Sequence, residues 1–248
     1  MENSRTLPSL ADCFDALGLK DVIEISKESE DTRAWFALAS GKGVFLKLFP
    51  NELDGNRLTV ETEIAGGNLH PAIVPLRRII TCELGTMLVY DRLDGENLGP
   101  MAARGRLQSL PLPERIAAAS TVVEALVSIT DAGFMIVDWY EGNMIYDFEQ
   151  GKIWLFDWEL CRKGIGFTLQ MDSNFGSSRL MAPEEFVRGS LLDQRTIVFN
   201  LGRYVLLTLP ELADSLAPVL ARATYPARSQ RYCSVRQFTE ALAWALAR

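Results

Sequence analysis

Residues 136–143 read Ile-Val-Asp-Trp-Tyr-Glu-Gly-Asn, and the interpretation of the chain starts from this stretch. Asp138 stands five residues before Asn143, and Asp157 follows fourteen residues after that Asn, at the end of the apolar, strand-like run 153–156. Phosphoryl transfer from ATP needs one carboxylate for the acceptor hydroxyl and further oxygen ligands for Mg²⁺. The spacing therefore predicts that Asp138 orients the hydroxyl and accepts its proton, and that Asn143 and Asp157 bind the metal.

A single lysine, Lys47, interrupts the apolar run 44–49, which is predicted to be a strand. An unpaired ammonium is costly to bury, so Lys47 either lies in water on an edge strand or belongs to a site. In the second case it holds the α- and β-phosphates of ATP and pairs with a glutamate on a helix. Glu61 is preferred to Glu63 as that partner because it stands nine residues before His70, where the chain enters the next strand.

The most distinctive local motif of the chain lies downstream, where residues 176–184 read Gly-Ser-Ser-Arg-Leu-Met-Ala-Pro-Glu. Apolar residues surround the following stretch 195–202 instead of lining one face, which predicts a helix buried on all sides. Residues 231–242 resemble the last turn and helix of bacterial kinases of the eukaryotic-like type.

The remaining patterns predict the coarse organisation of the chain. They indicate a short helix at 9–19, three strands within 21–49, and strands at 73–80 and 86–90. Apolar residues at helical spacing predict a helix over 114–130 that leads into the stretch 136–143.

In their order and spacing these motifs resemble those of the protein kinases. The chain is similar to small bacterial Ser/Thr protein kinases of the eukaryotic-like type, from about residue 21 to its C-terminus. The resemblance implies an α+β, two-lobed fold. Residues 1–92 would form an N-terminal extension and an N-lobe with a small antiparallel sheet and the Glu61 helix, and residues 93–248 a mainly helical C-lobe.

The resemblance also implies ATP and Mg²⁺ as cofactors, with Mn²⁺ as an alternative metal, and a protein as the substrate. Residues 91–96 would form the hinge between the lobes, where backbone groups of Asp91 and Leu93 hydrogen-bond the adenine edge. Ser177 would contact Asp138. Lys47 and Glu61 would act together on the phosphates.

Glu184 is expected to anchor the segment that it ends by pairing with an arginine from the late helices. The sequence leaves Arg231 and Arg228 as two candidates for this partner.

Several departures from the family pattern bear on function. No glycine-rich loop precedes Lys47; residues 25–35 hold three acids instead, which would repel a triphosphate unless they point outward. Val137 stands where the family has the arginine that receives an activation-loop phosphate. We therefore expect no requirement for phosphorylation at Thr168 or Ser173.

Three more departures lie near the predicted site. Tyr140 replaces a lysine, which removes one cation from the γ-phosphate. Asp157-Trp158-Glu159 lacks the flexible glycine of the family motif, which argues against a large flip of Asp157. Ile197 replaces an aspartate that normally braces the missing His-Arg pair.

Two other functions stay open beside an active protein kinase. The weak phosphate loop favours a pseudokinase or nucleotide-binding scaffold. The stretches 138–143 and 157–159 also resemble loops of aminoglycoside and choline kinases, which would make the chain a small-molecule phosphotransferase. Residues 181–185 favour a protein acceptor, because those enzymes lack the Ala-Pro-Glu segment.

Bulk composition agrees with a globular protein: 248 residues, 48% apolar and 23% charged. A net charge of −7 argues against nucleic acid as a partner. The four scattered cysteines and single histidine form no zinc motif and suggest reduced thiols in a cytoplasmic protein. No signal peptide is recognised, and no run of ~20 apolar residues predicts a membrane span.

Overall fold

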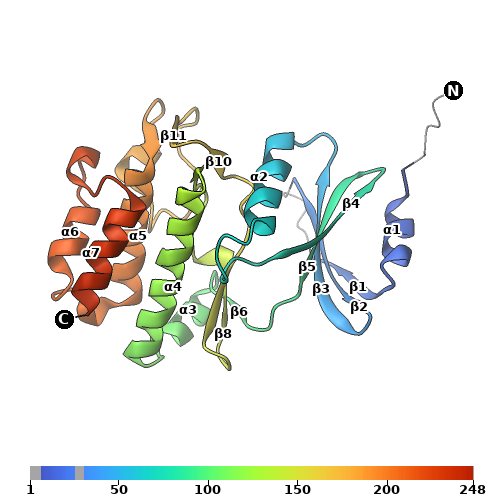
Figure 1. Cartoon of the computed structure of the whole chain (residues 1–248), viewed down its shortest axis with the longest axis horizontal. Helices are drawn as coiled ribbons and strands as arrows, with labels where there is room; N and C mark the ends of the chain where they lie inside the picture. Colours follow the sequence, from blue (N-terminus) through green and yellow to red (C-terminus); the bar gives the residue numbers. More distant parts are fainter. Residues whose placement is uncertain (1–6, 26–30, 248) are drawn as a thin grey trace. The chain divides into compact units, whose positions relative to one another are not determined.

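A computed structural model describes residues 7–25 and 31–247, and the chain divides into two units (Figure 1). The first unit comprises residues 1–68 and 74–94, and the second comprises residues 69–73 and 95–248. The class is mixed α and β, with an antiparallel sheet in the first unit.

The first unit is built on one five-stranded sheet in which every pairing is antiparallel. In spatial order its strands are β1 (Leu19–Glu24), β2 (Arg33–Ala39), β3 (Lys42–Pro50), β5 (Gly85–Asp91) and β4 (Leu76–Cys82). β2 and β3 form a hairpin closed by Ser40 and Gly41, whose φ angles are 50° and 80°. Positive φ at both central residues matches the right-handed twist of the strands, so this turn sets the register of the central strand β3.

Two helices belong to the first unit, α1 (Leu10–Ala16) and α2 (Gly55–Gly66). α1 is shorter than the expected 9–19; it begins after Ser9, which caps it with Asp12, and Gly18 follows with φ 60°. Cys13 on α1 lies in one core cluster with residues of the sheet, including Trp35 and Cys82. The helix therefore covers part of the sheet's apolar surface.

The strand expected at 73–80 begins later, at Leu76. Ile73 belongs to the second unit instead, where it forms a parallel bridge with Leu155, and the N–H of Leu155 donates to Ala72 at 2.8 Å. The predicted strand is thus present from Leu76 on, and the first residues of the stretch belong to a different pairing.

The second unit is largely helical. Its α-helices are α3 (Met101–Gln108), α4 (Leu112–Asp131), α5 (Gln194–Thr208), α6 (Ala217–Ala223) and α7 (Val235–Leu246). Its short strands are β6 (Glu96–Asn97), β7 (Phe134–Met135), β8 (Met144–Asp147), β9 (Lys152–Leu155), β10 (Arg162–Lys163), β11 (Gly166–Thr168) and β12 (Leu191–Asp193). In Figure 1, α4, α5 and α7 lie side by side, and all three pairs are in contact.

The prediction of a helix buried on all sides is confirmed for α5, which has no exposed residue from Gln194 to Thr208. Gly202 permits its close approach to α6, because a Cβ there would lie 2.9 Å from Ala223 Cβ and 2.9 Å from Thr224 Cγ2. The helices predicted over 114–130 and 231–242 are present as α4 and α7. Within the described residues, no helix is both long and apolar enough to cross a membrane.

Candidate functional site

Asn143 closes the loop that follows β7. Its side-chain Nδ2 donates a hydrogen bond to the backbone carbonyl of Asp138 at 2.7 Å, and its own N–H donates to the Tyr140 carbonyl at 3.0 Å. Asn143 is 6% exposed and ends the short 3₁₀ helix η1 (Glu141–Asn143). A buried amide with such partners holds the loop in one conformation.

A backbone hydrogen bond of the preceding residue, Phe156, places Asp157 near Asn143. β8 pairs with β9 up to Met144 and Leu155, and one step further the N–H of Phe156 donates to the Asn143 carbonyl at 3.1 Å. Asp157 therefore follows a residue bonded to Asn143. The structure brings Asp138, Asn143 and Asp157 into one locality of the second unit, although they are widely spaced in sequence.

Both aspartates have backbone conformations that non-glycine residues seldom adopt. The φ angle is 57° at Asp138 and 71° at Asp157. A non-glycine residue in this region costs about 1 kcal/mol or more, and such residues cluster at functional sites. At Asp138 the backbone is held by the hydrogen bond that its carbonyl accepts from Asn143.

A second layer of contacts, which no sequence motif predicts, supports the loop. Asn97 donates from Nδ2 to the carbonyls of Gly142, at 2.6 Å, and Met144, at 3.2 Å, while its Oδ1 accepts from the N–H of Gly99 at 2.9 Å. An isolated asparagine in a two-residue strand has no periodicity or motif that would mark it.

Tyr140 lies against Gly142. A Cβ on Gly142 would meet the Tyr140 ring at 2.3 Å from Cε2 and 2.7 Å from the hydroxyl oxygen. Burial, reinforced by the charges of Asp138 and Asp157, raises the pKa of the Tyr140 phenol. The hydroxyl therefore stays protonated near neutral pH and can donate a hydrogen bond, but it brings no positive charge.

In the first unit, Lys47 lies on β3, between β2 and β5. It is 9% exposed, and its ammonium lies 5.2 Å from the ring centroid of Phe49. The interpretation of Lys47 as a solvated residue on an edge strand is therefore wrong, because β3 is an inner strand and the side chain is buried.

Glu61 is also buried in the first unit, on α2, with 3% exposure. Its Oε1 accepts a hydrogen bond from the Tyr90 hydroxyl at 2.7 Å. Glu63, the alternative partner considered for Lys47, is exposed. Burial thus agrees with the choice of Glu61, because a glutamate is rarely buried without partners.

Asp91 and Leu93 lie at and beyond the end of β5. The N–H of Arg92 donates to the Gly43 carbonyl at 3.0 Å, and Asp91 is opposite Val44. Backbone groups alternate in direction along a strand, so those of Asp91 point away from β3. The side chain of Asp91 is paired with Arg77 at 2.6 Å, and both are about half exposed.

The expected place of a phosphate loop, residues 25–35, is only partly described. Residues 26–30, which include the acids Glu28 and Glu30, lie outside the described residues. The third acid, Asp31, accepts from Arg57 at 2.7 Å, so its charge is balanced by a neighbour.

Ser177 is half-buried at the start of the segment 176–184. Its carbonyl accepts from the N–H groups of Leu180, at 2.9 Å, and Met181, at 3.2 Å. The contact between the Ser177 side chain and Asp138 stays a prediction.

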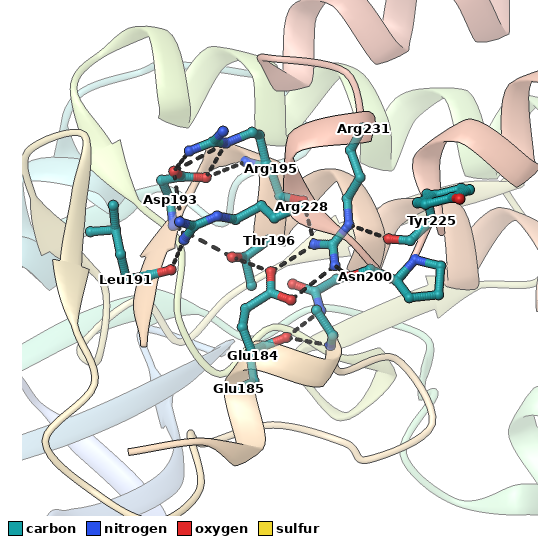
Figure 2. A network of polar contacts seen from close by, with 12 residues as sticks. Glu184, Glu185, Leu191, Asp193, Arg195, Thr196, Asn200, Tyr225, Arg228 and Arg231 are labelled. Atoms are coloured by element: carbon teal, nitrogen blue, oxygen red, sulfur yellow. Dashed lines mark hydrogen bonds and ion pairs between the residues drawn. The ribbon is translucent and has the colours of Figure 1, made fainter. Parts of the chain in front are cut away.

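The anchor of this segment is a buried ion pair (Figure 2). Arg231, 1% exposed, donates from Nη1 to Glu184 Oε1 at 2.6 Å and from Nη2 to Oε2 at 2.9 Å. Arg228 instead bonds the Leu191 carbonyl and lies 3.8 Å from Asp193. The prediction that a late arginine holds Glu184 is confirmed, and the partner is Arg231.

The two adjacent glutamates have opposite pKa shifts. Burial would raise the pKa of Glu184, but the hydrogen bonds and charge of Arg231 outweigh it, so the pKa is lowered. Burial raises the pKa of Glu185, even though its carboxylate accepts from Asn200 at 2.7 Å, from the Ala182 N–H at 2.7 Å and from Asn174 at 3.0 Å. Neutral donors stabilise a buried carboxylate less than a guanidinium does.

A divalent cation was expected at Asn143 and Asp157. No group of three His, Cys, Asp or Glu side chains that could hold a metal occurs in residues 7–25 and 31–247. Mg²⁺ does not need such a cage, because it commonly takes one or two protein oxygens and completes its shell with phosphates and water. The amide and carboxylate oxygens of these two residues have the required hard-donor chemistry.

In comparisons with protein-family models and with curated proteins, the chain matches none of them.

Proposed function

We propose that this chain has a two-lobed protein-kinase-like fold and transfers the γ-phosphoryl group of ATP to a Ser or Thr hydroxyl of a protein. The observation that carries the proposal is the double attachment of Asn143, to the Asp138 carbonyl at 2.7 Å and to the Phe156 N–H at 3.1 Å. Asn143 thereby links the loop that carries Asp138 to the end of β9, where Asp157 follows, so one carboxylate and two oxygen-donor side chains suited to Mg²⁺ lie near one another. Phosphoryl transfer depends mainly on such positioning.

In this proposal Asp138 orients the acceptor hydroxyl and receives its proton. Asn143 and Asp157 hold the magnesium, which when bound neutralises charge on the phosphates. Tyr140, next to these residues, contributes a neutral hydrogen-bond donor where the family places a lysine.

The first unit would bind the nucleotide. Lys47 supplies a buried cation for the α- and β-phosphates, and Glu61, fixed by the Tyr90 hydroxyl, holds that lysine in place. The backbone groups of Asp91, which point away from β3, and those of Leu93 would bind the adenine edge.

A protein acceptor is supported by the segment that ends in Ala182-Pro183-Glu184. The Glu184–Arg231 ion pair fixes the end of this segment, and we propose that the peptide acceptor binds against it. A small-molecule acceptor is the second candidate, because glycine before Asn143 and glutamate after Asp157-Trp158 are features shared with the aminoglycoside and choline kinases. The Tyr140 ring leaves no room for a larger residue at position 142.

The test is incubation of the chain with γ-labelled ATP and Mg²⁺, alone and with a generic basic protein. Label on protein that is lost in Asp138→Asn but kept in Asp131→Asn is the expected result. Asp131 is a matched control because it forms only a surface ion pair with Arg236 in the same unit.

Binding of Mg-ATP, measured by calorimetry, separates the alternatives. Retained binding without label on protein or metabolite would leave a nucleotide-binding scaffold. Label on an aminoglycoside, choline or a related amino alcohol in place of protein would move the assignment to the small-molecule class.

A further inference from the structure

The loop with Asp138 and the segment with Ser177 are joined by one ion pair. Arg179 donates from Nη2 to Glu141 Oε2 at 2.9 Å. The Glu141 side chain is 7% exposed, whereas that of Arg179 is 43% exposed. The carboxylate is thus buried within the loop and its cation reaches it from the segment.

The Arg179 guanidinium balances the charge of the buried Glu141 carboxylate. Its neighbour Tyr204 is fully buried, and burial, with a smaller contribution from the Glu141 charge, raises the pKa of the Tyr204 phenol. Tyr204 therefore stays neutral beside the carboxylate. Removal of the cationic partner of a buried carboxylate leaves its charge uncompensated.

The backbone of the segment is held from the other side by α5. Arg203 donates from Nε to the Arg179 carbonyl at 3.2 Å, and Asn200 donates from Nδ2 to the Leu180 carbonyl at 3.0 Å. The side chain of Arg179 is thus directed at Glu141 from a backbone that α5 already fixes. Movement of the loop or of the segment alone would break the pair.

The charges of this pair run opposite to those of a contact between a loop arginine and a phosphorylated segment. Val137 precedes Asp138, so the loop offers no arginine there to a phosphorylated segment. Here the anion belongs to the loop, as Glu141, and the cation belongs to the segment, as Arg179.

We propose that Arg179 is a positioning residue, which through its ion pair with Glu141 holds the acceptor-binding segment against the loop of Asp138 and Asn143 without phosphorylation. The inference rests on the proposed function for its kinetic consequence, but its structural part does not.

Hydrogen exchange tests the structural part whether or not the chain transfers phosphate. The reporters are the amides of Leu180 and Met181, which donate to the Ser177 carbonyl. We expect exchange about fivefold faster in Arg179→Gln, the scale of a partly exposed ion pair, and close to that of the unmodified chain in Arg179→Lys.

Arg236→Gln is the matched control, because Arg236 forms an exposed ion pair with Asp131 in the same unit. It should leave both amides unchanged. Two results would overturn the proposal. One is that the reporter amides exchange at the same rate in Arg179→Gln as in the unmodified chain, and the other is that Arg236→Gln accelerates their exchange as much as Arg179→Gln does. Because Arg179 is partly exposed, its substitution is compatible with folding.

Kinetics test the positioning role. In Arg179→Gln the KM for the protein acceptor should rise about fivefold while the KM for ATP stays constant, and Arg179→Lys should restore it. Glu141→Gln should add little to Arg179→Gln, because both remove one interaction. A change confined to the KM for ATP would contradict the role. Absence of transfer by the unmodified chain would refute the proposed function and leave the exchange result to decide on the ion pair.

Discussion

Arg231 binds both carboxylate oxygens of Glu184, at 2.6 Å and 2.9 Å, from a position with 1% exposure. Its remaining donors go to backbone carbonyls of Tyr225, Pro226 and Arg195. One side chain therefore fastens the Ala-Pro-Glu segment to α5 and to the chain before α7, as Figure 2 shows.

Replacement of Arg231 by methionine should destabilise the chain by about 3–5 kcal/mol, because the buried Glu184 carboxylate would lose its cation. Arg231→Lys should recover only part of this loss, since an ammonium cannot bind both oxygens in the planar, bidentate geometry. Urea unfolding measures both effects. A loss below about 1 kcal/mol, the range of exposed pairs, would mean that the pair contributes no more than a surface contact.

Acid should lower the free energy of unfolding by protonating Glu184. Its pKa is lower folded than unfolded, so the unfolded state binds more protons and the stabilisation is present above the unfolded value, near ~4.3. It is lost as the pH falls through the folded pKa. Unfolding free energies measured from pH 6 downward should therefore fall less steeply in Glu184→Gln than in Glu149→Gln, a change at an exposed glutamate. Parallel curves for the two variants would remove Glu184 from the acid response.

Gly142→Ala should reduce phosphoryl transfer at least about tenfold, because displacement of catalytic groups by a fraction of an ångström has effects of this size. The added Cβ would lie 2.3 Å from Tyr140 Cε2, so the ring must move. Gly105→Ala is the control: nothing lies within 4 Å of its Cβ on α3, and alanine there should stabilise the helix by about 0.5–1 kcal/mol. Initial rates with labelled ATP measure the first effect. Full activity of Gly142→Ala would show that the Tyr140 position is irrelevant to transfer.

Lys47→Met should abolish transfer and weaken Mg-ATP binding, since the buried cation of β3 that we propose meets the phosphates would be lost. The size and flexibility of methionine suit the buried position, but the buried Glu61 carboxylate would lose the cation that we propose pairs with it, so the urea midpoint should fall and binding is measured well below it. Lys42→Met is the matched control, because Lys42 is exposed on the same strand. Calorimetric titration with Mg-ATP distinguishes the two, and equal affinity in both variants would remove Lys47 from the nucleotide site.

Elements with strong local patterns were predictable from the sequence. The helices α4 and α5 and the strand around Lys47 follow from periodicity and apolar runs, which reflect burial directly. The helix α7 was expected from the family resemblance alone. The position of Lys47 between two strands was not predictable, because the order of strands in a sheet depends on long-range pairing. The same holds for Ile73, which leaves its apolar run to pair with Leu155.

Residues that act through partners far away in sequence were the hardest to find. Glu184 was expected to have an arginine partner, yet only the folded chain distinguishes Arg231 from Arg228. Glu141 and Arg179 are separated by 38 residues and belong to no local pattern. Asn97 contacts the loop across 45 residues, and neither residue type nor spacing marks it as a support.

The hydrogen bond from Asn143 to Asp138 uses only the nitrogen end of the Asn143 side-chain amide. Nδ2 is committed to the Asp138 carbonyl at 2.7 Å, which leaves Oδ1 as the end that can face a cation. An aspartate at position 143 would be as good a magnesium ligand, yet it would set a carboxylate oxygen against the Asp138 carbonyl with no proton between them. In the proposed site the same side chain donates on one side and accepts on the other, and asparagine places these two functions on different atoms, whereas a serine or threonine hydroxyl would perform both at a single oxygen.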